Sequence, residues 1–394
     1  DPQVRRNTEK QIKEFFEDKN ADYGRKLYLI QKCIYGVDIQ QIAVEIAKLR
    51  FFISLLVDEE IDKSKENWGV EPLPNLDFKI MQGNSLISEF LGIDFDDGKA
   101  GQKQAAMLFA EREDALIEEF EQKKNDFQNE PDKHKKAKLK NEVEDLMIKI
   151  FEAKVRKQKA DYFRQLEEIE KKYAWLPNQK TREAMIAQEK QELSRRTGFN
   201  LENIEKELRE YTSKNKTKPF FPWKLYFAEV FKKGGFDIAI GNPPYVQLQK
   251  DGGKLAKLYQ SLNYETFART GDIYTLFYEK GITLLRYQGI LCYITSNKWM
   301  RAGYGEKLRA YFTKYNPLLL IDLGPGVFES ATVDTSILLI QKCECQKNLL
   351  AATYNDRSLS IEQTVKLKAV KLEKLTKDAW FIGSSAEQRL KEKI

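Results

Sequence analysis

The sequence has very few of the residues that build disulfide frameworks and zinc sites. Among 394 residues there are four cysteines, Cys33, Cys292, Cys343 and Cys345, and one histidine, His134. Cysteines this few and this unevenly spaced do not form a disulfide framework and are typical of a reducing cytosol. One histidine in a lysine-rich run excludes Ser-His-Asp triads and Cys2His2 zinc sites. Cys343 and Cys345 have no second cysteine pair, so we expect no metal site.

Long apolar runs and a strong net charge are also lacking. No apolar run approaches the roughly twenty residues of a membrane span, and the charged stretch from Asp1 to Asp18 does not resemble a signal peptide. We therefore expect a soluble, cytoplasmic protein with no membrane partner. The net charge of +6 permits a polyanionic partner without requiring one. A chain with 42% hydrophobic residues can bury two or three cores at about 150 residues each.

The first of three compositional regions, residues 1–100, has the pattern of alternating strands and helices. Cys33–Asp38 has the length and composition of a short buried strand, and Gln40–Val57 carries apolar residues at three- and four-residue steps. Lys79–Gln82 is a second strand candidate. A strand followed by a sheet-covering helix is half of a βαβ unit.

The second region, residues 101–218, is rich in charged residues and poor in glycine. A narrow apolar stripe with charged flanks predicts long helices that pack as a hairpin or short coiled coil. We place turns at Asn129–Asp132 and Leu176–Asn178. The lysine-rich run Lys133–Lys140 is interpreted as a solvated helix face rather than a phosphate site, because carboxylates are equally common nearby.

The third region, residues 219–345, alternates again. It predicts the strands Phe236–Gly241, Gly289–Thr295, Leu318–Leu323 and Thr335–Gln341 and the helices Tyr274–Leu285 and Glu306–Lys314. The first and third regions together predict one α/β domain, which the helical region interrupts as an insertion. Residues 346–394 have a weaker pattern and are interpreted as a connector.

The strongest local signal is the segment Asn242-Pro243-Pro244-Tyr245, which follows the strand Phe236–Gly241. Two prolines fix the backbone at the carboxyl end of a strand, which is where α/β folds bind ligands. The Asn242 side chain and the Pro243 carbonyl offer two oxygen acceptors, and Tyr245 offers a flat face for stacking. This arrangement suits a planar NH2 group. The alternative is a proline-rich turn with a buried aromatic residue.

Neutral acceptors fit the chemistry of an aromatic amine. The nitrogen lone pair is delocalised into the ring, so the amine is a poor nucleophile. Two accepted N–H bonds draw the nitrogen toward a tetrahedral form and aim its lone pair at an electrophile. No strong base is then needed.

At these residues the chain resembles the adenine-specific N6 DNA methyltransferases, in particular the methyltransferase region of large single-chain type II restriction-modification enzymes. Asn242–Tyr245 resembles their catalytic motif. Further segments resemble their other motifs in the same order, namely Tyr35–Ile39, Gln82–Leu86, Asp272–Phe277, Gly289–Asn297 and Val327–Thr335. The likeness covers the first and third regions and leaves out the helical insertion.

The resemblance implies a class I S-adenosylmethionine-dependent, Rossmann-like core. It implies that Asp38 binds the ribose hydroxyls of S-adenosylmethionine, that Ile39 lies beside its adenine, and that Asn84 and Ser85 meet the edge of that ring. Asp272 is expected on the cofactor side of the cleft. Asp38 and Asp272 have an equally simple explanation as helix caps, and Asn84 as a turn residue.

The resemblance also implies double-stranded DNA as the partner and a flipped-out adenine as the target. Phe328 is expected to contact the flipped base from the side opposite Tyr245, with a core aromatic as the alternative. Lys250 and Lys254, followed by Lys257, could neutralise phosphates, although solvated lysines are the default interpretation.

The chain departs from the family pattern at the methyl-donor site. The glycine-rich motif is missing, and Gly324-Pro325-Gly326 lies far downstream in another context. We therefore expect a fragment, with two unpaired inner strand edges and weak methyl-donor binding at best. A target-recognition domain is expected to follow in a longer chain, and the sequence leaves open whether a nuclease is attached. Methylation of a protein glutamine, or a scaffold without catalysis, are the alternative functions.

Overall fold

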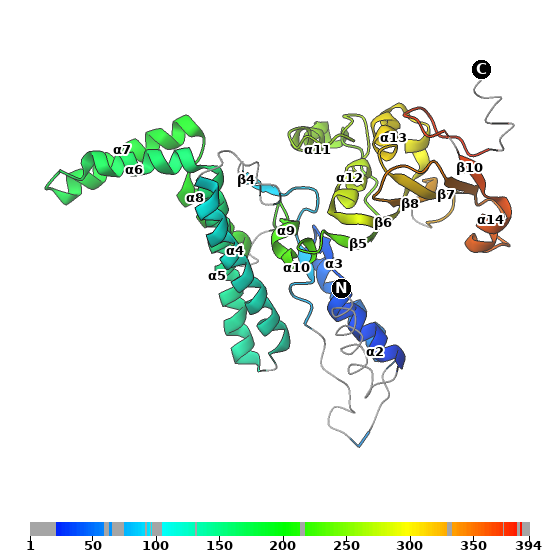
Figure 1. Ribbon diagram of the computed structural model, residues 1–394, viewed down its shortest axis with the longest axis horizontal. Helices are drawn as coiled ribbons and strands as arrows, with labels where there is room; N and C mark the ends of the chain where they lie inside the picture. Colours follow the sequence, from blue (N-terminus) through cyan, green and yellow to red (C-terminus); the bar gives the residue numbers. More distant parts are fainter. Residues whose placement is uncertain are drawn as a thin grey trace. The chain divides into compact units, whose positions relative to one another are not determined.

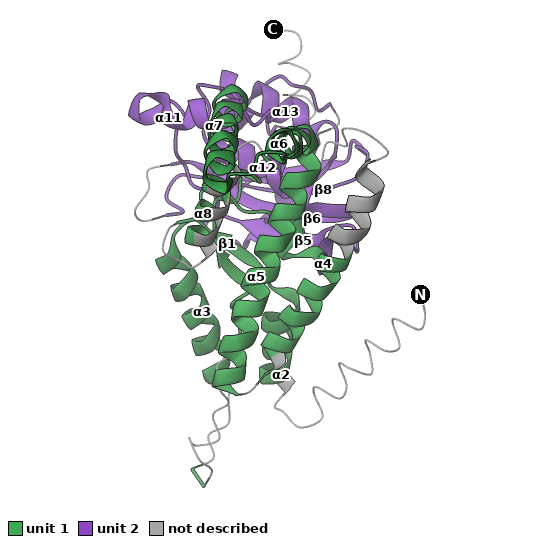
Figure 2. Ribbon diagram, turned by 90° about the vertical axis from the view of Figure 1, so that its left-hand side faces the viewer, with its two compact units in different colours: residues 1–228 green, residues 229–394 purple. Residues whose placement is uncertain are grey.

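The computed structural model describes residues 21–58, 63–64, 75–90, 93–94, 96, 105–130, 132–212, 217–328, 333–372, 374–383 and 387. The architecture is mixed α/β, as the sequence predicts. The chain divides into two compact units, residues 1–228 and 229–394 (Figure 2). Across the described ranges, none of the helices has the length and hydropathy that a membrane-spanning segment requires.

Unit 1 begins with two short parallel strands and the helices around them. The helix α2 (Ala21–Tyr28) runs into a π-helical turn, η1 (Leu29–Cys33), and the strand β1 (Gly36–Asp38) follows. The strand predicted over Cys33–Asp38 is therefore shorter than expected. Its first residue belongs to the turn, because the Ile34 N–H donates to the Leu29 carbonyl at 3.0 Å and prolongs the helix. The strand β2 (Ile80–Gln82) pairs with β1 in parallel.

The helix α3 (Gln41–Leu56) lies between these strands, close to its predicted bounds. It buries Val44, Lys48 and Leu55. Most of the apolar stripe expected to cover a sheet is instead exposed, with 64% of Ile42 and 54% of Leu49 accessible. Because β1 and β2 have three residues each, they offer little surface for the helix to cover.

Five helices follow the small hairpin of β3 (Glu89–Phe90) and β4 (Ile93–Asp94). They are α4 (Ala105–Asn129), α5 (Lys133–Gln158), α6 (Ala160–Tyr173), α7 (Gln179–Thr197) and α8 (Leu201–Thr212). The predicted apolar stripe is buried on α5, at Val143, Leu146, Met147, Ile150 and Phe151. Figures 1 and 2 show α4 beside α5, and Figure 1 shows α6 beside α7.

Side-chain caps fix the two turns that the sequence predicts. The Asp132 side chain accepts from the Lys135 N–H at 2.8 Å and starts α5, and Asn178 accepts from the Thr181 N–H at 3.2 Å and starts α7. Such caps satisfy N–H groups that the first turn of a helix leaves without partners. Lys133 and Lys135 are exposed at the start of α5, in agreement with a solvated face. Two short helices, α9 (Trp223–Tyr226) and α10 (Ala228–Phe231), follow.

Unit 2 contains a six-stranded mixed sheet in the order β10-β9-β7-β8-β6-β5. Its strands are β5 (Phe236–Gly241), β6 (Leu285–Ser296), β7 (Asn316–Gly324), β8 (Thr335–Gln341), β9 (Leu349–Thr353) and β10 (Val370–Leu372). Its helices are α11 (Lys250–Gln260), α12 (Tyr274–Leu284), α13 (Glu306–Phe312) and α14 (Ile361–Lys368), with the 3-10 turns η3 (Asn297–Met300) and η4 (Gly303–Gly305). The predicted bounds of β5 and β8 are confirmed.

The connector expected over residues 346–394 contains regular structure that the sequence did not indicate. The strand β9 pairs in parallel with β7, and β10 pairs with β9. The 374–383 segment is also tied to the unit, because the Trp380 N–H donates to the Met300 carbonyl at 2.9 Å. Strands of five and three residues with mixed burial leave little periodicity to detect.

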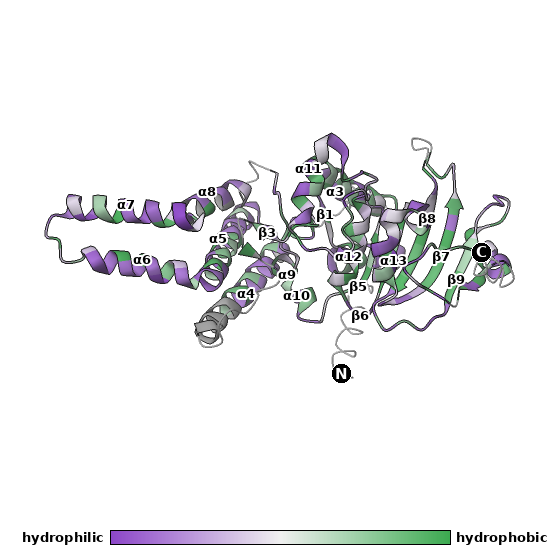
Figure 3. Cartoon of the chain, turned by 90° about the horizontal axis from the view of Figure 1, so that it is seen from above, coloured by the Kyte–Doolittle hydropathy of each residue, from purple (hydrophilic) through white to green (hydrophobic). Residues whose placement is uncertain are grey.

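The core of unit 2 is aromatic. Tyr274, Tyr278, Trp299 and Phe312 are fully buried between the sheet and its helices, and Figure 3 shows hydrophobic colouring along the strands β7 and β9. Trp299 packs edge-on against Phe312 at 5.3 Å between ring centroids. Removing such a side chain costs about 3–5 kcal/mol of stability. This core fixes the sheet end on which the predicted catalytic segment lies.

The strand β5 forms one edge of this sheet. Its apolar side chains are open, with 64% of Ile238 and 81% of Ile240 accessible. An exposed apolar edge strand offers unpaired backbone groups to a further strand. β1 likewise pairs only with β2 in the described part of the chain. Each of these two strands therefore has one edge without a strand partner in the described part of the chain.

Candidate active site

The segment Asn242-Pro243-Pro244-Tyr245 lies at the carboxyl end of β5, where the sequence places it. Asn242 is exposed and Pro243 is buried. Among the described residues, no hydrogen bond uses the Asn242 amide or the Pro243 carbonyl oxygen. Two acceptors are therefore left for a ligand at a position fixed by two prolines.

The Tyr245 ring is held from two sides. Its hydroxyl donates to the Ile294 carbonyl on β6 at 3.4 Å, and its ring meets Tyr274 of α12 edge-on at 6.2 Å between centroids. Burial raises the pKa of Tyr245, so the hydroxyl stays neutral. The ring is half-buried and keeps one orientation, as a stacking surface requires.

Asp272 lies immediately beside this segment. The Ile273 N–H donates to the Val246 carbonyl at 2.9 Å, and Gln247 and Asp272 form an antiparallel bridge. The Asp272 carboxylate accepts from the Tyr304 hydroxyl at 3.0 Å. The side chain makes no cap on α12, so the helix-cap alternative does not describe it.

Two tyrosines extend the Asp272 contact. The hydroxyl groups of Tyr274 and Tyr304 are 2.8 Å apart. Because Tyr304 gives its proton to Asp272, it accepts from Tyr274. Burial raises the pKa of both tyrosines, so both hydroxyls remain protonated donors. This chain of donors connects Asp272 to the residue that packs against Tyr245.

In unit 1, the structure brings together four of the five residues predicted to bind the methyl donor, and the fifth, Asp272, lies in unit 2. The Gly83 N–H donates to the Asp38 carbonyl at 2.9 Å, which joins the turns after β1 and β2. Asp38 Oδ1 accepts from the Gln40 N–H at 2.7 Å. This bond closes a turn before α3 and is not a helix cap, since the N-cap residue is Gln40. Ile39 is 51% exposed beside it.

Asn84 behaves as the turn alternative describes. Its side-chain oxygen accepts from the Leu86 N–H at 3.1 Å, and 8% of the residue is exposed. Ser85 uses its carbonyl to accept from Trp223 Nε1 at 3.0 Å. A side chain at Gly83 would meet the Phe220 carbonyl at 2.9 Å, so the turn needs glycine for close approach.

The residues predicted to contact DNA lie in unit 2. Phe328 is half-buried on the segment after β7 and lies outside the buried core cluster. Lys250 and Lys254 are exposed on α11, and no ion pair of theirs is present among the described residues. Because β5, β6 and β7 run in the same direction, the Asn242 segment and the Phe328 segment both follow the carboxyl ends of strands at the same end of the sheet.

The sequence did not indicate Tyr304 as a site residue. It lies in η4 between Gly303 and Gly305, and glycines on both sides of an aromatic residue are a signal for a packed turn. Tyr274 falls within the Asp272–Phe277 motif and could have been found there.

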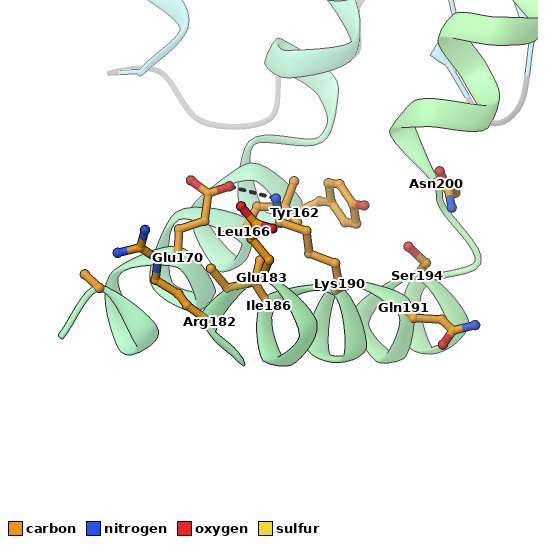
Figure 4. Close-up of a pocket in the computed structure, with 12 residues that line it drawn as sticks. Tyr162, Leu166, Glu170, Arg182, Glu183, Ile186, Lys190, Gln191, Ser194 and Asn200 are labelled. Atoms are coloured by element: carbon orange, nitrogen blue, oxygen red, sulfur yellow. Dashed lines mark hydrogen bonds and ion pairs between the residues drawn. The ribbon is translucent and has the colours of Figure 1, made fainter. Parts of the chain in front are cut away.

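A hollow of about 820 Å³ lies between α6 and α7. Figure 4 shows Leu166 and Ile186 facing into it, and Glu170 and Lys190 pair across it at 2.7 Å. None of the predicted site residues lines it. Among the described residues, no cluster of His, Cys, Asp or Glu could hold a metal ion.

Comparisons with known proteins point to one family. The family model described as Eco57I restriction-modification methylase matches residues 32–328. A Methanocaldococcus jannaschii protein named as a type II restriction enzyme and methyltransferase is 28% identical over 81% of this chain and 26% of its own length. A Geobacillus stearothermophilus type II methyltransferase is 31% identical over 35% of this chain and 24% of its own length. The chain thus spans about a quarter of these relatives.

Among solved structures, the type IIL restriction-modification enzyme MmeI in complex with DNA is 14% identical, over 40% of this chain and 21% of that one, with a TM-score of 0.30. The modification subunit of a type I restriction enzyme from Vibrio vulnificus is 14% identical, over 37% and 31%, with a TM-score of 0.26. Both TM-scores are too low for these likenesses to support a conclusion.

Proposed function

Because the chain belongs to the Eco57I restriction-modification methylase family, we propose that it carries the catalytic part of a DNA methyltransferase that modifies the N6 amine of adenine. The observation that carries the proposal is the pair of acceptors at the end of β5. The Asn242 amide and the Pro243 carbonyl have no hydrogen bond to other described residues, while the Tyr245 ring beside them is held by β6 and α12. Two oxygens and a ring suit the amine and the face of adenine.

In this proposal the target adenine is rotated out of the duplex. Asn242 Oδ1 and the Pro243 carbonyl accept its two N6 protons, and Tyr245 stacks on the ring. The held amine nitrogen forms a bond to the methyl carbon as the carbon–sulfur bond breaks, and the extra N6 proton leaves to water. The sulfur takes the electron pair, so S-adenosylhomocysteine is the second product.

S-adenosylmethionine supplies an electrophilic methyl group when it is bound. The residues after β1 and β2 fit such a ligand. Asp38 is exposed and spends one carboxylate oxygen on Gln40, which leaves the other oxygen for ribose hydroxyls. Ile39 offers an open apolar face for an adenine ring. Ser85 and Asn84 would lie at the edge of that ring, although the Asn84 oxygen is already used within its turn.

Asp272 would support the base-binding segment of its own unit through its turn next to Tyr245. Its carboxylate accepts from the Tyr304 hydroxyl, so Asp272 would stabilise the segment that holds the base, beside the cofactor-binding role that the resemblance implies. Phe328 would contact the flipped adenine opposite Tyr245. Lys250 and Lys254 would neutralise DNA phosphates, since the described residues give them no acidic partner.

Family membership supports DNA as the acceptor over a protein glutamine and over a scaffold without catalysis. A target-recognition domain and a nuclease elsewhere in the intact protein stay part of the proposal.

The test is methyl transfer by the intact protein. Tritiated S-adenosylmethionine is supplied with unmethylated DNA, and in parallel with a mixture of proteins, and the methylated DNA is digested to nucleosides. We expect label in N6-methyladenosine of the deoxy series. Label only in protein, or in another nucleoside, would contradict the proposal, and transfer to neither acceptor would support the scaffold.

A further inference from the structure

The segment that carries Phe328 leaves the sheet through a glycine-rich turn. Gly324 and Gly326 flank Pro325 with φ values of 64° and 74°. This left-handed backbone suits glycine and turns the chain sharply after β7. The chain then passes Val327 and Phe328 and returns to the sheet at β8, with residues 329–332 outside the described residues. A turn of two glycines needs outside contacts to keep one conformation.

Asn297, just after β6, joins the two ends of this segment. Its side-chain Nδ2 donates to Asp322 Oδ1 at 2.9 Å, and its backbone N–H donates to the Asp334 carbonyl at 2.9 Å. Asp322 Oδ1 also accepts from the Gly324 N–H at 3.2 Å. The outgoing and returning strands are therefore tied at one residue.

Arg357, after β9, holds the turn from the other side. Its Nη2 donates to the Leu323 carbonyl and to the Pro325 carbonyl, each at 3.0 Å. The two acceptors lie on either side of Gly324. A bond to each neighbour fixes the peptide planes around that glycine, and so the direction in which the chain leaves toward Phe328.

The arginine is itself held in place. Its guanidinium lies 4.8 Å from the centroid of the Tyr354 ring. The Tyr354 N–H donates to the Asp322 carbonyl at 2.8 Å, and the Tyr354 hydroxyl donates to the Leu359 carbonyl at 2.8 Å. Stacking on an aromatic face is a contact that a planar guanidinium makes well. The contacts around Arg357 thus lead back to the strand that starts the turn.

We propose that Arg357 is a positioning residue for DNA methylation: it fixes the turn at Gly324 so that Phe328 meets the flipped adenine. The proposal rests on the proposed function. It gives a role in the reaction to the region after β9, which the sequence suggested was a connector. Arg357 acts through Phe328 and makes no contact with DNA in this assignment.

A residue that positions the turn must keep the shape of its side chain, whereas a residue that binds phosphate needs only its positive charge. Both hydrogen bonds come from Nη2, and the stacking of the guanidinium on Tyr354 sets where that nitrogen lies. A lysine side chain is shorter and has no planar group to stack on the ring. Arg357→Lys therefore keeps the charge and loses the arrangement. Lys366, on α14 of the same region, bonds only to Glu362 in the described residues and is the matched control as Lys366→Ala.

The experiment uses the intact protein. The methylated sequence is first found by sequencing DNA that the wild-type protein has modified, and a duplex is then made with 2-aminopurine at the target position. Three quantities are measured: DNA affinity, 2-aminopurine fluorescence in the complex, and the single-turnover methylation rate on the natural duplex. The proteins compared are wild type, Arg357→Ala, Arg357→Lys, Phe328→Ala, the Arg357→Ala/Phe328→Ala double variant and Lys366→Ala.

We expect Arg357→Ala to lower the methylation rate about tenfold, the effect of losing two hydrogen bonds. DNA affinity stays within about twofold, and 2-aminopurine is brighter than with wild type because it no longer stacks against Phe328, although Tyr245 still covers its other face. Arg357→Lys resembles Arg357→Ala, and Lys366→Ala resembles wild type. The double variant is no slower than Phe328→Ala, because both changes remove one function.

Three results would overturn the proposal. The first is a wild-type methylation rate for Arg357→Ala. The second is full activity of Arg357→Lys together with weaker DNA binding by Arg357→Ala. The third is a double variant that loses as much rate as the two single variants added together. The second result would assign the residue to phosphate binding. If wild type itself does not methylate DNA, the proposed function fails first, so the two failures are distinguishable.

Discussion

The two predicted ligand-binding regions, one in each unit, use their polar side chains in opposite ways. In unit 1, Asp38 and Asn84 accept hydrogen bonds from their own turns. In unit 2, Asn242 has no hydrogen bond to other described residues, and the neighbouring Tyr245 is held by a large aromatic core. The residues proposed to bind the methyl donor, Asp38 and Asn84, therefore contribute to local structure as well as to the proposed binding. The Asn242 side chain bonds to no other described residue, so its substitution should separate function from stability.

The largest effect is expected at Asn242. Asn242→Ala removes one of the two proposed acceptors, and the loss of one such bond to the reacting group typically lowers the rate by about 10²–10³-fold. The melting temperature should not change, because the side chain bonds to no described residue. Gln249→Ala, an exposed amide after the same segment, is the control and should keep both activity and stability. Activity of Asn242→Ala near the wild-type value would remove the contrast between the two regions.

In the region proposed to bind the methyl donor, Gly83→Ala tests how tightly the turn is packed. A Cβ atom would lie 2.8 Å from the Phe221 ring and 2.9 Å from the Phe220 carbonyl. Such overpacking costs about 1–3 kcal/mol, so denaturant unfolding should occur at lower concentration. Gly303→Ala, which meets no atom within 4 Å, is the matched control. Equal stability of the two variants would show that the turn can open without cost.

A smaller effect is expected at Asp38. Asp38→Asn keeps an oxygen to accept from the Gln40 N–H and removes the charge that would bind ribose hydroxyls. We expect the KM for S-adenosylmethionine to rise about tenfold, as for one charge-assisted hydrogen bond, with unchanged stability. Asp38→Ala also removes the hydrogen bond to the Gln40 N–H and should lose about 1 kcal/mol of stability. An unchanged KM for S-adenosylmethionine in both variants would show that Asp38 serves only to close its turn.

The smallest expected effect is on the dependence of stability on pH. In unit 1, hydrogen bonds from Lys123 and Lys172 lower the pKa of Glu142 and Glu189, so these pairs stabilise above the usual carboxyl pKa and are lost as the pH falls. In unit 2, burial raises the pKa of Glu279, so its stabilising contribution is present in acid and is lost as the pH rises. The melting temperature of each variant is compared with that of wild type at pH 7 and at pH 4. Going from pH 4 to pH 7, this difference should become more negative for Glu189→Gln and more positive for Glu279→Gln. Shifts of the same sign would contradict these pKa directions.

Much of the fold could be predicted because the relevant signals are local. The prolines after β5 mark the end of that strand, and the turn segments Asn129–Asp132 and Leu176–Asn178 mark the breaks between the long helices. Family membership confirms the methyltransferase fold class. The exposed stripe of α3 could not be predicted, because periodicity shows that a face is apolar and does not show what covers it.

The supporting contacts of the site were also out of reach. Tyr304 lies 32 residues from Asp272, and Arg357 lies 34 residues from Leu323. Neither contact has a sequence pattern, because one depends on how β7 pairs with β9 in the sheet of unit 2 and the other on how the chain before α12 packs against η4. Motifs identified the residues proposed to touch ligands, while the residues that hold them needed the structure.

The most direct measurement is a structure of the intact protein with its DNA target and a methyl-donor analogue that cannot transfer a methyl group. The account predicts the N6 atom of a flipped adenine within roughly 2.7–3.2 Å of both Asn242 Oδ1 and the Pro243 carbonyl oxygen, with the ring on Tyr245. An adenine left in the duplex, or an amine held by other groups while Asn242 faces solvent, would contradict it.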